Sequence, residues 1–423
     1  MSFTEELKWR GLLQEMTPGT EELLTNEKIV GYIGFDPTAP SMTIGNYVPI
    51  MLLTLFQKHG HTPLVLMGGA TGRIGDPSGK DAERQLKSGE ELDRNLAHQI
   101  EQVKKFLDFS DKSPNPALVV NNYDFYKDMS ILDFLRDIGK HLTVNYMLSK
   151  ESVKKRLETG ISFTEFSYQL IQGYDFLELY RKYNCVIQMG GSDQWGNITA
   201  GTEVIRRFGE GPAFALTAPL LTKADGKKFG KSEEGNIWLD PRMTSPYKFY
   251  QFWINAEDAD IPKFFRYFSL REKEEILAVE ERMATEPNVV KQELAEELTT
   301  RIHSEEACRA VQEVTAILFT RNAGRDQVLN LSEAAFEAFK EEIPTFYVKN
   351  PGDPMDISEL LCENASVFKS KGEMRRAIQG NAVSINKVKW SSIEDRLDPQ
   401  EWIFNKYLMV ENGKKNKYLI VAE

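Results

Sequence analysis

The sequence predicts an α/β protein in which a doubly wound parallel sheet is followed by an all-helical domain and a small α+β module. Three observations support this. Short apolar strands alternate with helical patterns through residue 220, which is typical of βαβ units. Residues 247–320 are rich in Glu, Leu, Ala and Lys at helical spacing, with almost no strand signal. Proline and glycine at 344–356 then separate a final segment from the helices.

The first βαβ unit lies near the N-terminus. Lys28–Phe35 is predicted to be a buried strand, and Pro63–Met67 the next strand. The helix Ile44–Lys58 joins them and ends at Gly60. Such a crossover is right-handed and connects parallel strands. A sharp turn separates the first strand from its helix, so we expect the helix to start at Thr43–Asn46.

Later elements continue the same alternation. Ser88–Phe109 is a predicted helix, and Leu118–Val120 is a short strand that ends at Asn121. Further predicted elements are helices at Ile131–Ile138, Ser149–Glu158 and Ser167–Tyr183, a strand at Cys185–Met189, and a helix beginning near Asn197. We expect domains at residues 1–232 (the sheet with a helical insertion), 233–330 (helical), 331–356 (a linker) and 357–423 (the small module).

Composition narrows the class of protein. No run of 18 apolar residues predicts a membrane span, and the acidic N-terminus lacks the apolar stretch of a secretory signal. Three distant cysteines favour reduced thiols in a cytoplasm over a disulfide frame or a zinc site. The net charge of -11 argues against a general nucleic-acid binder. Residues 366–423, however, carry 11 Lys+Arg and 7 Asp+Glu, and this basic module is a candidate RNA-binding surface or an ordinary solvated one.

Three segments are candidates for a nucleotide triphosphate site. The helix start at Thr43–Asn46 offers free N–H groups and a partial positive charge, and Lys228–Ser232 offers two cations between glycines. The turn Gly190–Asp193 follows a predicted strand, at the edge of the sheet where ligands bind in doubly wound folds. Taken alone, the turn and the lysine pair are also consistent with a tight turn and a solvated face.

Two other phosphate motifs are excluded. The stretch from Gly72 to Lys80 is similar to a P-loop, but only three residues separate Gly75 from Gly79, and Asp81 follows the lysine in place of Ser or Thr. A GxGxxG fingerprint is absent from the sequence.

A helix face carries three polar residues. Tyr168, Gln172 and Asp175 are spaced i, i+4 and i+7 in the helix predicted at Ser167–Tyr183, so they share one face. Buried polar groups need partners. The face is therefore either a substrate-binding surface or a structural hydrogen-bond network.

Many stretches in order match one family. They are Gly68–Gly72, Gly75–Lys80, Val144–Met147, Gly160–Tyr168, Gly190–Asn197, Lys228–Ser232 and Thr244–Tyr247. With these, the chain resembles a bacterial-type tyrosyl-tRNA synthetase, a class I aminoacyl-tRNA synthetase, over essentially all 423 residues. The resemblance implies a Rossmann-like catalytic domain, a helical anticodon-recognition domain and a small RNA-binding module related to a ribosomal protein. It also implies a cytoplasmic homodimer.

The resemblance implies tyrosine–tRNA ligase activity. L-Tyrosine reacts with ATP, which brings Mg²⁺, and the tyrosyl group then moves to tRNA(Tyr). The implied tyrosine site comprises Tyr32, Asp76, Asn122, Tyr168, Gln172, Asp175 and Gln194. The implied catalytic residues are Thr38, Thr43, Asn46, Lys80, Arg84, Lys228 and Lys231. ATP binding is implied for Gly45, Gly191, Asp193, Lys228, Phe229, Gly230, Lys231 and Ser232, and tRNA binding for Lys369, Lys371, Arg375, Arg376 and Lys389.

The chain departs from the family at one signature. The family usually has His-Ile-Gly-His, whereas this chain has Thr43-Ile44-Gly45-Asn46. Threonine can donate one hydrogen bond but carries no charge, and the Asn46 amide can donate much as an imidazole does. Neighbouring Ile33 and Pro49 are apolar and give up contacts to the nucleotide ribose. Open alternatives are a tryptophanyl-tRNA synthetase, a non-catalytic synthetase-derived RNA-binding protein, and a nucleotidyltransferase acting on another substrate.

Overall fold

A computed structural model describes all residues except 79–86, 158–159, 225, 227–228, 233–234, 320–323, 350–353 and 414–415, and the side chains of Ser152, Lys155, Lys231, Ser232 and Phe319. The chain forms two compact units. The first comprises Met1–Met243 and Ala256–Lys291, and the second comprises Thr244–Asn255 and Gln292–Glu423. Among the described residues, no helix is long and apolar enough to cross a membrane.

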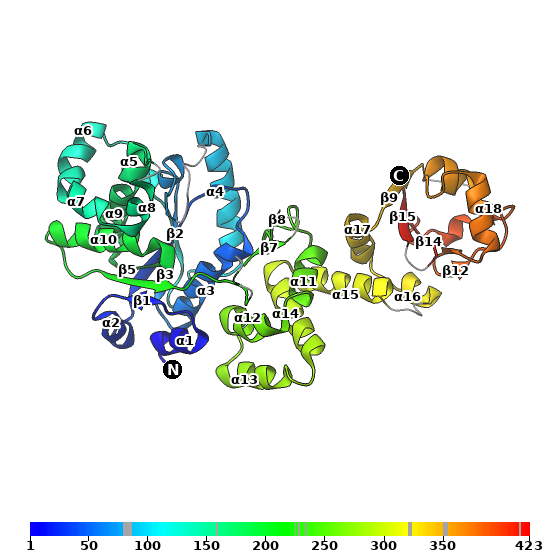
Figure 1. The fold of residues 1–423 in the computed structure, drawn as a ribbon, viewed down its shortest axis with the longest axis horizontal. Coiled ribbons are helices and arrows are strands. Elements are labelled where there is room, and N and C mark those ends of the chain that lie inside the picture. The colour runs from blue at the N-terminus through cyan, green and yellow to red at the C-terminus, as the bar shows by residue number, and fades with distance from the viewer. Residues whose placement is uncertain are drawn as a thin grey trace. The chain divides into compact units, whose positions relative to one another are not determined.

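The first unit is built on a six-stranded sheet (Figure 1). In spatial order its strands are β1 (Glu15–Met16), β6 (Phe214–Ala218), β5 (Cys185–Gly191), β2 (Val30–Phe35), β3 (Thr62–Met67) and β4 (Leu118–Asn121). Strands β6, β5, β2, β3 and β4 are all parallel to their neighbours, as expected for a doubly wound sheet, and β1 pairs antiparallel with β6 at one edge. The chain proceeds outward from β2 in one direction and from β5 in the other, so the topological switch point lies between these two strands.

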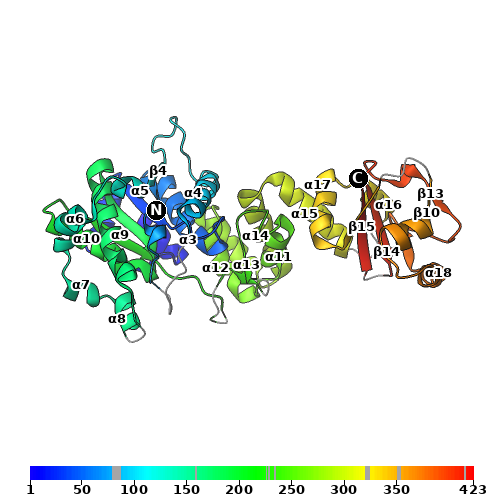
Figure 2. The ribbon, with the colours of Figure 1, turned by 90° about the horizontal axis from the view of Figure 1, so that it is seen from above.

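Helices cover both faces of this sheet. Helices α3 (Ile44–Lys58) and α4 (Gly89–Val103) lie on one side, and α9 (Phe163–Tyr183) and α10 (Trp195–Arg207) on the other, in both views (Figures 1 and 2). The remaining helices of the unit are α1 (Phe3–Arg10), α2 (Thr20–Asn26), α5 (Tyr123–Tyr126), α6 (Ile131–Asp133), a π-helical turn (Phe134–Ile138), α7 (Val144–Leu148), α8 (Glu151–Leu157), α12 (Ile261–Phe268) and α13 (Lys273–Arg282).

The buried face of α3 explains the close packing against the sheet. Leu53, Leu55 and Phe56 have no exposed surface. Opposite them, β2 carries Gly31, where an added Cβ would lie 2.6 Å from Ile187 and 2.8 Å from the ring of Phe56. Only glycine therefore lets β2 fit between the helix and β5.

Several helix and strand ends differ from the sequence prediction, and at the start of α9 a capping side chain explains the difference. Helix α9 begins at Phe163 rather than Ser167, because the Ser162 hydroxyl accepts from the backbone N–H of Glu165. Helix α4 ends at Val103 rather than Phe109, and the prediction at Ile131–Ile138 corresponds to α6 and the π-helical turn. Strand β2 starts at Val30, two residues after Lys28.

The helical segment after the sheet is divided between the units. Helices α12 and α13 belong to the first unit. They are held there by the buried Arg10 of α1, whose guanidinium donates to the carbonyls of Arg266 and Ser269 at 2.8 Å each. Phe268 also stacks on Tyr47 of α3. These long-range contacts are not visible in the helical spacing that marked 233–330 as one domain.

The second unit contains α11 (Pro246–Ile254), the latter part of α14 (Pro287–Ile302), α15 (Glu305–Phe319), α16 (Arg325–Leu329) and α17 (Glu333–Glu342). Its five-stranded sheet has the order β12 (Val388–Lys389), β11 (Val383–Ile385), β14 (Tyr407–Asn412), β15 (Asn416–Ala422) and β9 (Thr345–Val348). Helix α18 (Lys371–Gln379) and a short pair, β10 (Met355–Asp356) with β13 (Arg396–Leu397), complete it. The stretch expected as a linker thus carries α17 and β9.

Candidate active site

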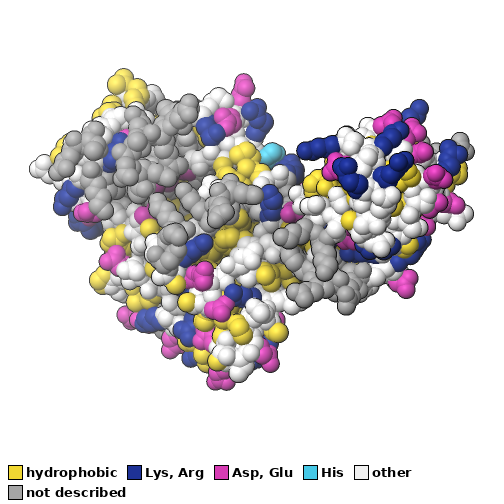
Figure 3. Space-filling model, turned by 45° about the vertical axis from the view of Figure 1, so that its right-hand side comes forward, with side chains coloured by type: hydrophobic (Ala, Val, Ile, Leu, Met, Phe, Trp, Pro, Cys, Tyr) yellow, Lys and Arg dark blue, Asp and Glu magenta, His cyan; other side chains and the backbone are white. Residues whose placement is uncertain are grey.

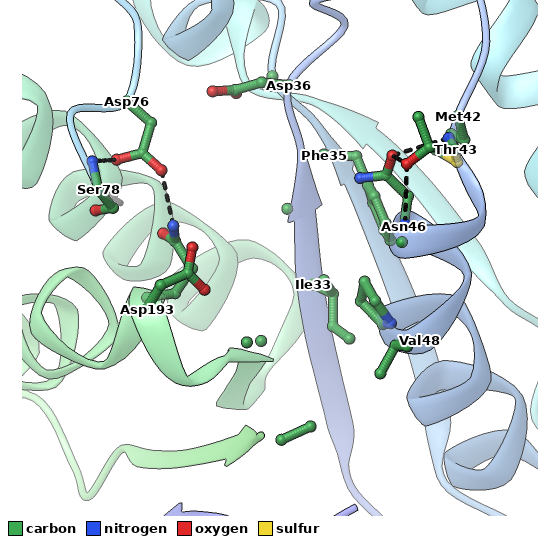
Figure 4. Close-up of a pocket in the computed structure, with 18 of the residues that line it drawn as sticks. Ile33, Phe35, Asp36, Met42, Thr43, Asn46, Val48, Asp76, Ser78 and Asp193 are labelled. Atoms are coloured by element: carbon green, nitrogen blue, oxygen red, sulfur yellow. Dashed lines mark hydrogen bonds between the residues drawn. The ribbon is translucent and has the colours of Figure 1, made fainter. Parts of the chain in front are cut away.

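A cavity of about 690 Å³ opens at the carboxyl ends of β2 and β5. This is the switch point of the sheet, where doubly wound folds bind ligands. Figure 4 shows side chains from β2, from the start of α3 and from the segments after β3 and β5 converging on it. Thirteen residues named from the sequence line the cavity: Tyr32, Thr38, Thr43, Gly45, Asn46, Asp76, Tyr168, Gln172, Asp175, Gly191, Asp193, Gln194 and Phe229.

The deep end of the cavity carries a buried hydroxyl and a buried carboxylate. Tyr32 of β2 and Asp175 of α9 are 0% and 1% exposed. The Tyr32 hydroxyl has no hydrogen-bond partner among the described residues. The Asp175 carboxylate accepts from the Tyr126 hydroxyl at 2.7 Å and from the Asn122 amide at 2.9 Å. Burial raises the pKa of Asp175 to about 7, although both of these donors lower it.

Asn122 does not line the cavity itself. It is fully buried behind Asp175, and its Oδ1 accepts from the backbone N–H of Ala70 at 2.7 Å. Its amide also donates to the Thr71 hydroxyl at 3.1 Å. The position of Asn122 is therefore set by three contacts, and it acts on the cavity through Asp175.

Two further acidic groups lie nearer the mouth. Asp76 accepts from the Gln194 amide at 2.7 Å and from the backbone N–H of Ser78 at 2.9 Å, as Figure 4 shows in part. Asp36, which directly follows β2, accepts from the Tyr168 hydroxyl at 2.9 Å. Tyr168, Gln172 and Asp175 all reach the cavity, as their helical spacing predicted. The wall therefore presents several oxygen acceptors, which suits a cationic group of a ligand.

The start of α3 forms the opposite wall. Thr43 is the N-cap, and its hydroxyl donates to Oδ1 of Asn46 at 2.8 Å. The backbone N–H of Thr43 donates to the same oxygen at 3.0 Å. The Asn46 oxygen is thereby used, and its amide nitrogen is turned toward the cavity (Figure 4). From the sequence, the Thr43 hydroxyl was expected to donate its hydrogen to a bound ligand. In the structure it donates that hydrogen to Asn46 within the capping box.

The turn after β5 adds Gly191 and Asp193. Asp193 lines the cavity, and burial, followed by the charge of Asp76, raises its pKa above the ordinary value. An added Cβ on Gly191 would lie 2.7 Å from the Asp193 carboxylate. Glycine at this position lets the turn approach the carboxylate closely.

Part of the lysine segment is anchored beside α3. The ring of Phe229 packs between Phe264 and Phe268 of α12, with centroids 5.0 Å and 5.6 Å apart. Gly230 has a φ of 82°, and its Cα lies against Ile44, at the start of α3. Lys80, Arg84 and Lys228 lie outside the described residues. Lys231 and Ser232 form strand β7, which pairs with β8 (Gly235–Asn236), and their side chains lie outside the described part.

The expected RNA-binding residues lie in the second unit. Lys369, Lys371, Arg375, Arg376 and Lys389 are all exposed, on and around α18 and β12. Lys371 pairs with Glu363 at 2.9 Å, and Lys389 donates to the carbonyl of Asn381 at 2.7 Å. Figure 3 shows Lys and Arg side chains on this module, interspersed with Asp and Glu.

Sequence reasoning missed three residues of the site. Asp36 and Thr71 line the cavity, and Tyr126 supports Asp175 from behind. Asp36 had a usable signal, because it immediately follows the strand that ends at Phe35. Thr71 and Tyr126 are recognised only from the three-dimensional contacts.

Two family descriptions match the chain. "tRNA synthetases class I (W and Y)" matches residues 24–320, and "Tyrosine--tRNA ligase SYY-like C-terminal domain" matches residues 335–421. The first spans both the sheet with its cavity and the helices that follow. The class of protein is thus a class I tRNA synthetase.

Individual relatives narrow the class. The chain is 52% identical over 431 aligned residues to a tyrosine–tRNA ligase of Bacteroides fragilis, covering 100% of both chains. It is 53% identical over 426 residues to that of Cytophaga hutchinsonii, covering 99% of both. A C-terminally truncated mitochondrial tyrosyl-tRNA synthetase of Aspergillus nidulans is similar in structure, with a TM-score of 0.68, 30% identity, and 75% and 94% of the two chains covered. The chain belongs to the tyrosine–tRNA ligase family.

Proposed function

We propose that this chain activates L-tyrosine with ATP and transfers the tyrosyl group to the 3′ end of tRNA(Tyr). The observation that carries the proposal is the pairing of Tyr32 and Asp175 at the closed end of the cavity. Full-length relatives at about half identity are ligases, which weighs against a non-catalytic RNA-binding role. In this account the reaction takes place in the cytoplasm, and ATP enters as its magnesium complex.

The deep end of the cavity selects the phenol. An ionised Asp175 accepts the phenolic hydrogen, and the free Tyr32 hydroxyl bonds to the same oxygen of the substrate. Both groups are buried, so a ligand without a hydroxyl leaves the Tyr32 hydroxyl without a partner and Asp175 without a donor on the cavity side. Tyrosyl-tRNA synthetases favour tyrosine over phenylalanine by a factor of about 10⁵ through such a site, and we expect the same discrimination here. The phenol site also favours tyrosine over tryptophan as the substrate, because the indole of tryptophan offers only an N–H donor and no oxygen acceptor for Tyr32.

The acidic wall holds the ammonium of the amino acid. Asp76, Tyr168 and Gln172 supply its acceptors, and Gln194 lies beside the carboxylate of the substrate. The bond from Gln194 to Asp76 supports this arrangement, because it fixes the amide where the ammonium and carboxylate meet. Asn122 takes part by holding Asp175.

The nucleotide occupies the side of the cavity near α3. Asn46 donates its free amide hydrogens, and the N–H groups at the helix start, with Gly45, face the phosphates. Thr38 supplies a hydroxyl near the outer phosphates. Gly191 and Asp193 bind the ribose. The cations that neutralise the triphosphate are Lys80 and Arg84, which follow the Gly75–Gly79 stretch of the sequence, and Lys228 and Lys231. The last two lie on the segment that also carries Phe229, Gly230 and Ser232.

The first step of the reaction needs no general base, because the tyrosine carboxylate is already a nucleophile. A carboxylate oxygen of tyrosine attacks the α-phosphorus, and pyrophosphate leaves with the bonding electron pair. A ribose hydroxyl of the tRNA then attacks the carbonyl of the adenylate, and AMP leaves. Catalysis therefore consists of positioning and of charge neutralisation at the phosphates.

The C-terminal module binds tRNA through its basic residues. We assign phosphate contacts to Lys369, Lys371, Arg375, Arg376 and Lys389, and anticodon recognition to the helical part of the second unit. Replacing Arg375 and Arg376 by glutamate is expected to reduce tRNA charging and to leave adenylate formation unchanged. Loss of both activities in that variant would contradict the assignment.

The active species is a homodimer. Its support is a set of exposed apolar side chains on α6, the following turn, α7 and the start of α9: Ile131, Leu132, Leu135, Val144 and Phe163. Phe163 is 75% exposed, which is unusual for an aromatic side chain. A symmetric pair of these surfaces would remove them from water.

The direct test is ATP–pyrophosphate exchange with each amino acid. Exchange with tyrosine, and none above background with tryptophan or phenylalanine, is the expected result. Exchange with another amino acid but not with tyrosine would overturn the proposal.

A further inference from the structure

Tyr126 lies outside the cavity but holds one of the groups inside it. Its hydroxyl donates to Oδ1 of Asp175 at 2.7 Å and lies 2.8 Å from the carbonyl of Ile171. Its ring packs edge-on against Tyr174, with centroids 5.6 Å apart, and tilted against Phe134 at 6.2 Å. The ring is therefore fixed, and the hydroxyl is aimed at the carboxylate.

Among the residues that the structure describes, no lysine, arginine or histidine pairs with Asp175 to keep it ionised. The titratable groups that interact with it come from β2 and the residue after it, from α5 and from α9 itself, and they are Tyr32, Asp36, Tyr126, Tyr168, Tyr174 and Glu178. Each of these groups is neutral or acidic. Two neutral donors, Tyr126 and Asn122, are thus what stabilises the anion at this buried position.

The two donors occupy different oxygens. Asn122 bonds to Oδ2 and Tyr126 to Oδ1, so the carboxylate plane is fixed from both sides. A carboxylate has about four acceptor positions, and two remain for the cavity. One of them can accept from the phenol of the substrate only while the plane keeps this orientation.

We propose that Tyr126 is a specificity-positioning residue, whose hydroxyl keeps the Asp175 carboxylate oriented and ionised so that it accepts the phenolic hydrogen of tyrosine. The inference rests on the proposed function and identifies a residue that acts through another. Phenylalanine has no hydrogen to offer, so the state of Asp175 matters less to its binding. Tyr126 therefore governs the ratio of tyrosine to phenylalanine activation more than the rate of adenylate formation.

The pH dependence follows from the contacts. Asp175 already has a pKa of about 7 because of burial, and the Tyr126 hydrogen bond lowers it. Removing that bond moves the pKa upward, so the carboxyl is neutral at pH 7 in a larger share of molecules. Raising the pH restores the anion. A variant at Tyr126 is thus rescued by alkaline buffer, whereas a packing defect is not.

The test compares Tyr126→Phe with Tyr174→Phe in pyrophosphate exchange across the neutral and mildly alkaline range. Both variants keep a ring in place, and the Tyr174 hydroxyl hydrogen-bonds to Glu178, its interaction with Asp175 being electrostatic only and weaker. Tyr126→Phe is expected to raise KM for tyrosine about 10- to 100-fold at neutral pH, the effect of one hydrogen bond to a charged group. We expect kcat to change much less, the tyrosine-to-phenylalanine ratio to fall, and KM to recover as the pH rises.

Calorimetric binding of tyrosine without ATP provides a second readout, with the same shift expected in Kd. Tyr174→Phe should leave the amino acid ratio and its pH profile unchanged. Equal losses with both amino acids at every pH, or no loss, would overturn the role of Tyr126. Failure of the unmodified protein to activate tyrosine would instead overturn the proposed function.

Discussion

Replacing Thr43 by valine separates two effects of the hydroxyl group that caps α3. Valine keeps the shape of threonine and removes two contacts, the bond to Oδ1 of Asn46 at 2.8 Å and the cap on the N–H of Asn46 at 3.4 Å. Loss of an N-cap costs about 1 kcal/mol. In a unit of this size that corresponds to a fall in Tm of about 2–4 °C. We expect this fall from Thr43→Val.

The effect on activity should be small by comparison. Oδ1 of Asn46 still accepts from the backbone N–H of Thr43 at 3.0 Å, so the amide keeps most of its orientation. We expect pyrophosphate exchange with tyrosine to fall by about tenfold at most, the loss of one neutral hydrogen bond. Asn46→Asp removes the donor itself and adds a negative charge near the phosphates, and should reduce exchange by about 10²–10³.

Thr54→Val is the matched control on the same helix. Its hydroxyl donates to the carbonyl of Ile50 at 2.9 Å, away from the cavity. Neither exchange nor stability should change appreciably in that variant. If Thr43→Val reduced exchange as strongly as Asn46→Asp, the threonine hydroxyl would itself contact the nucleotide. The conclusion that its hydrogen is used inside the capping box would then be refuted.

Three further predictions concern stability and assembly. Burial lowers the pKa of His61 to about 4. Between about pH 6.5 and 4 the unfolded chain therefore binds a proton on His61 that the folded chain does not, and the free energy of unfolding should fall as the pH drops from about 6.5 toward 4. In urea titrations, His61→Gln should make the free energy of unfolding less dependent on pH in this range. Gly31→Ala places a Cβ 2.6 Å from Ile187 and should lower the free energy of unfolding by about 1–3 kcal/mol. The control Gly324→Ala, whose Cβ has nothing within 4 Å, should lower it little. Equal losses in the two variants would contradict the packing argument. Phe163→Asp should shift sedimentation toward the monomer, and an unchanged dimer would exclude that surface.

Four of the six strands of the sheet (β2, β3, β4 and β5) were predictable from sequence because they are short apolar runs between turn signals, whereas β1 and β6 were not predicted. The first βαβ unit is confirmed in order and type, with helix α3 starting within Thr43–Asn46 as expected. The common face of Tyr168, Gln172 and Asp175 followed from helical period alone. These features depend on residues close in the chain.

The rest depended on contacts between distant residues. Arg10 binds carbonyls more than 250 positions away, and this places α12 and α13 with the sheet. Tyr126 meets Asp175 across 49 positions, which no local pattern indicates. The hydrogen bond from the Thr43 hydroxyl to Oδ1 of Asn46 joins residues close in the chain. Whether it forms depends on the rotamers of both side chains, which the sequence pattern does not indicate.

The strand order of the C-terminal sheet bears on how the chain matures during synthesis. Strand β15 (Asn416–Ala422) is the last of the five strands in chain order, yet it lies between β14 and β9. The parallel partner of β15 was made more than 70 positions earlier. This sheet therefore closes only after β15 has been synthesised, whereas the strands around the cavity are complete by Ala218. A nascent chain would acquire the fold for adenylate chemistry before it acquired the surface that receives the nucleic acid.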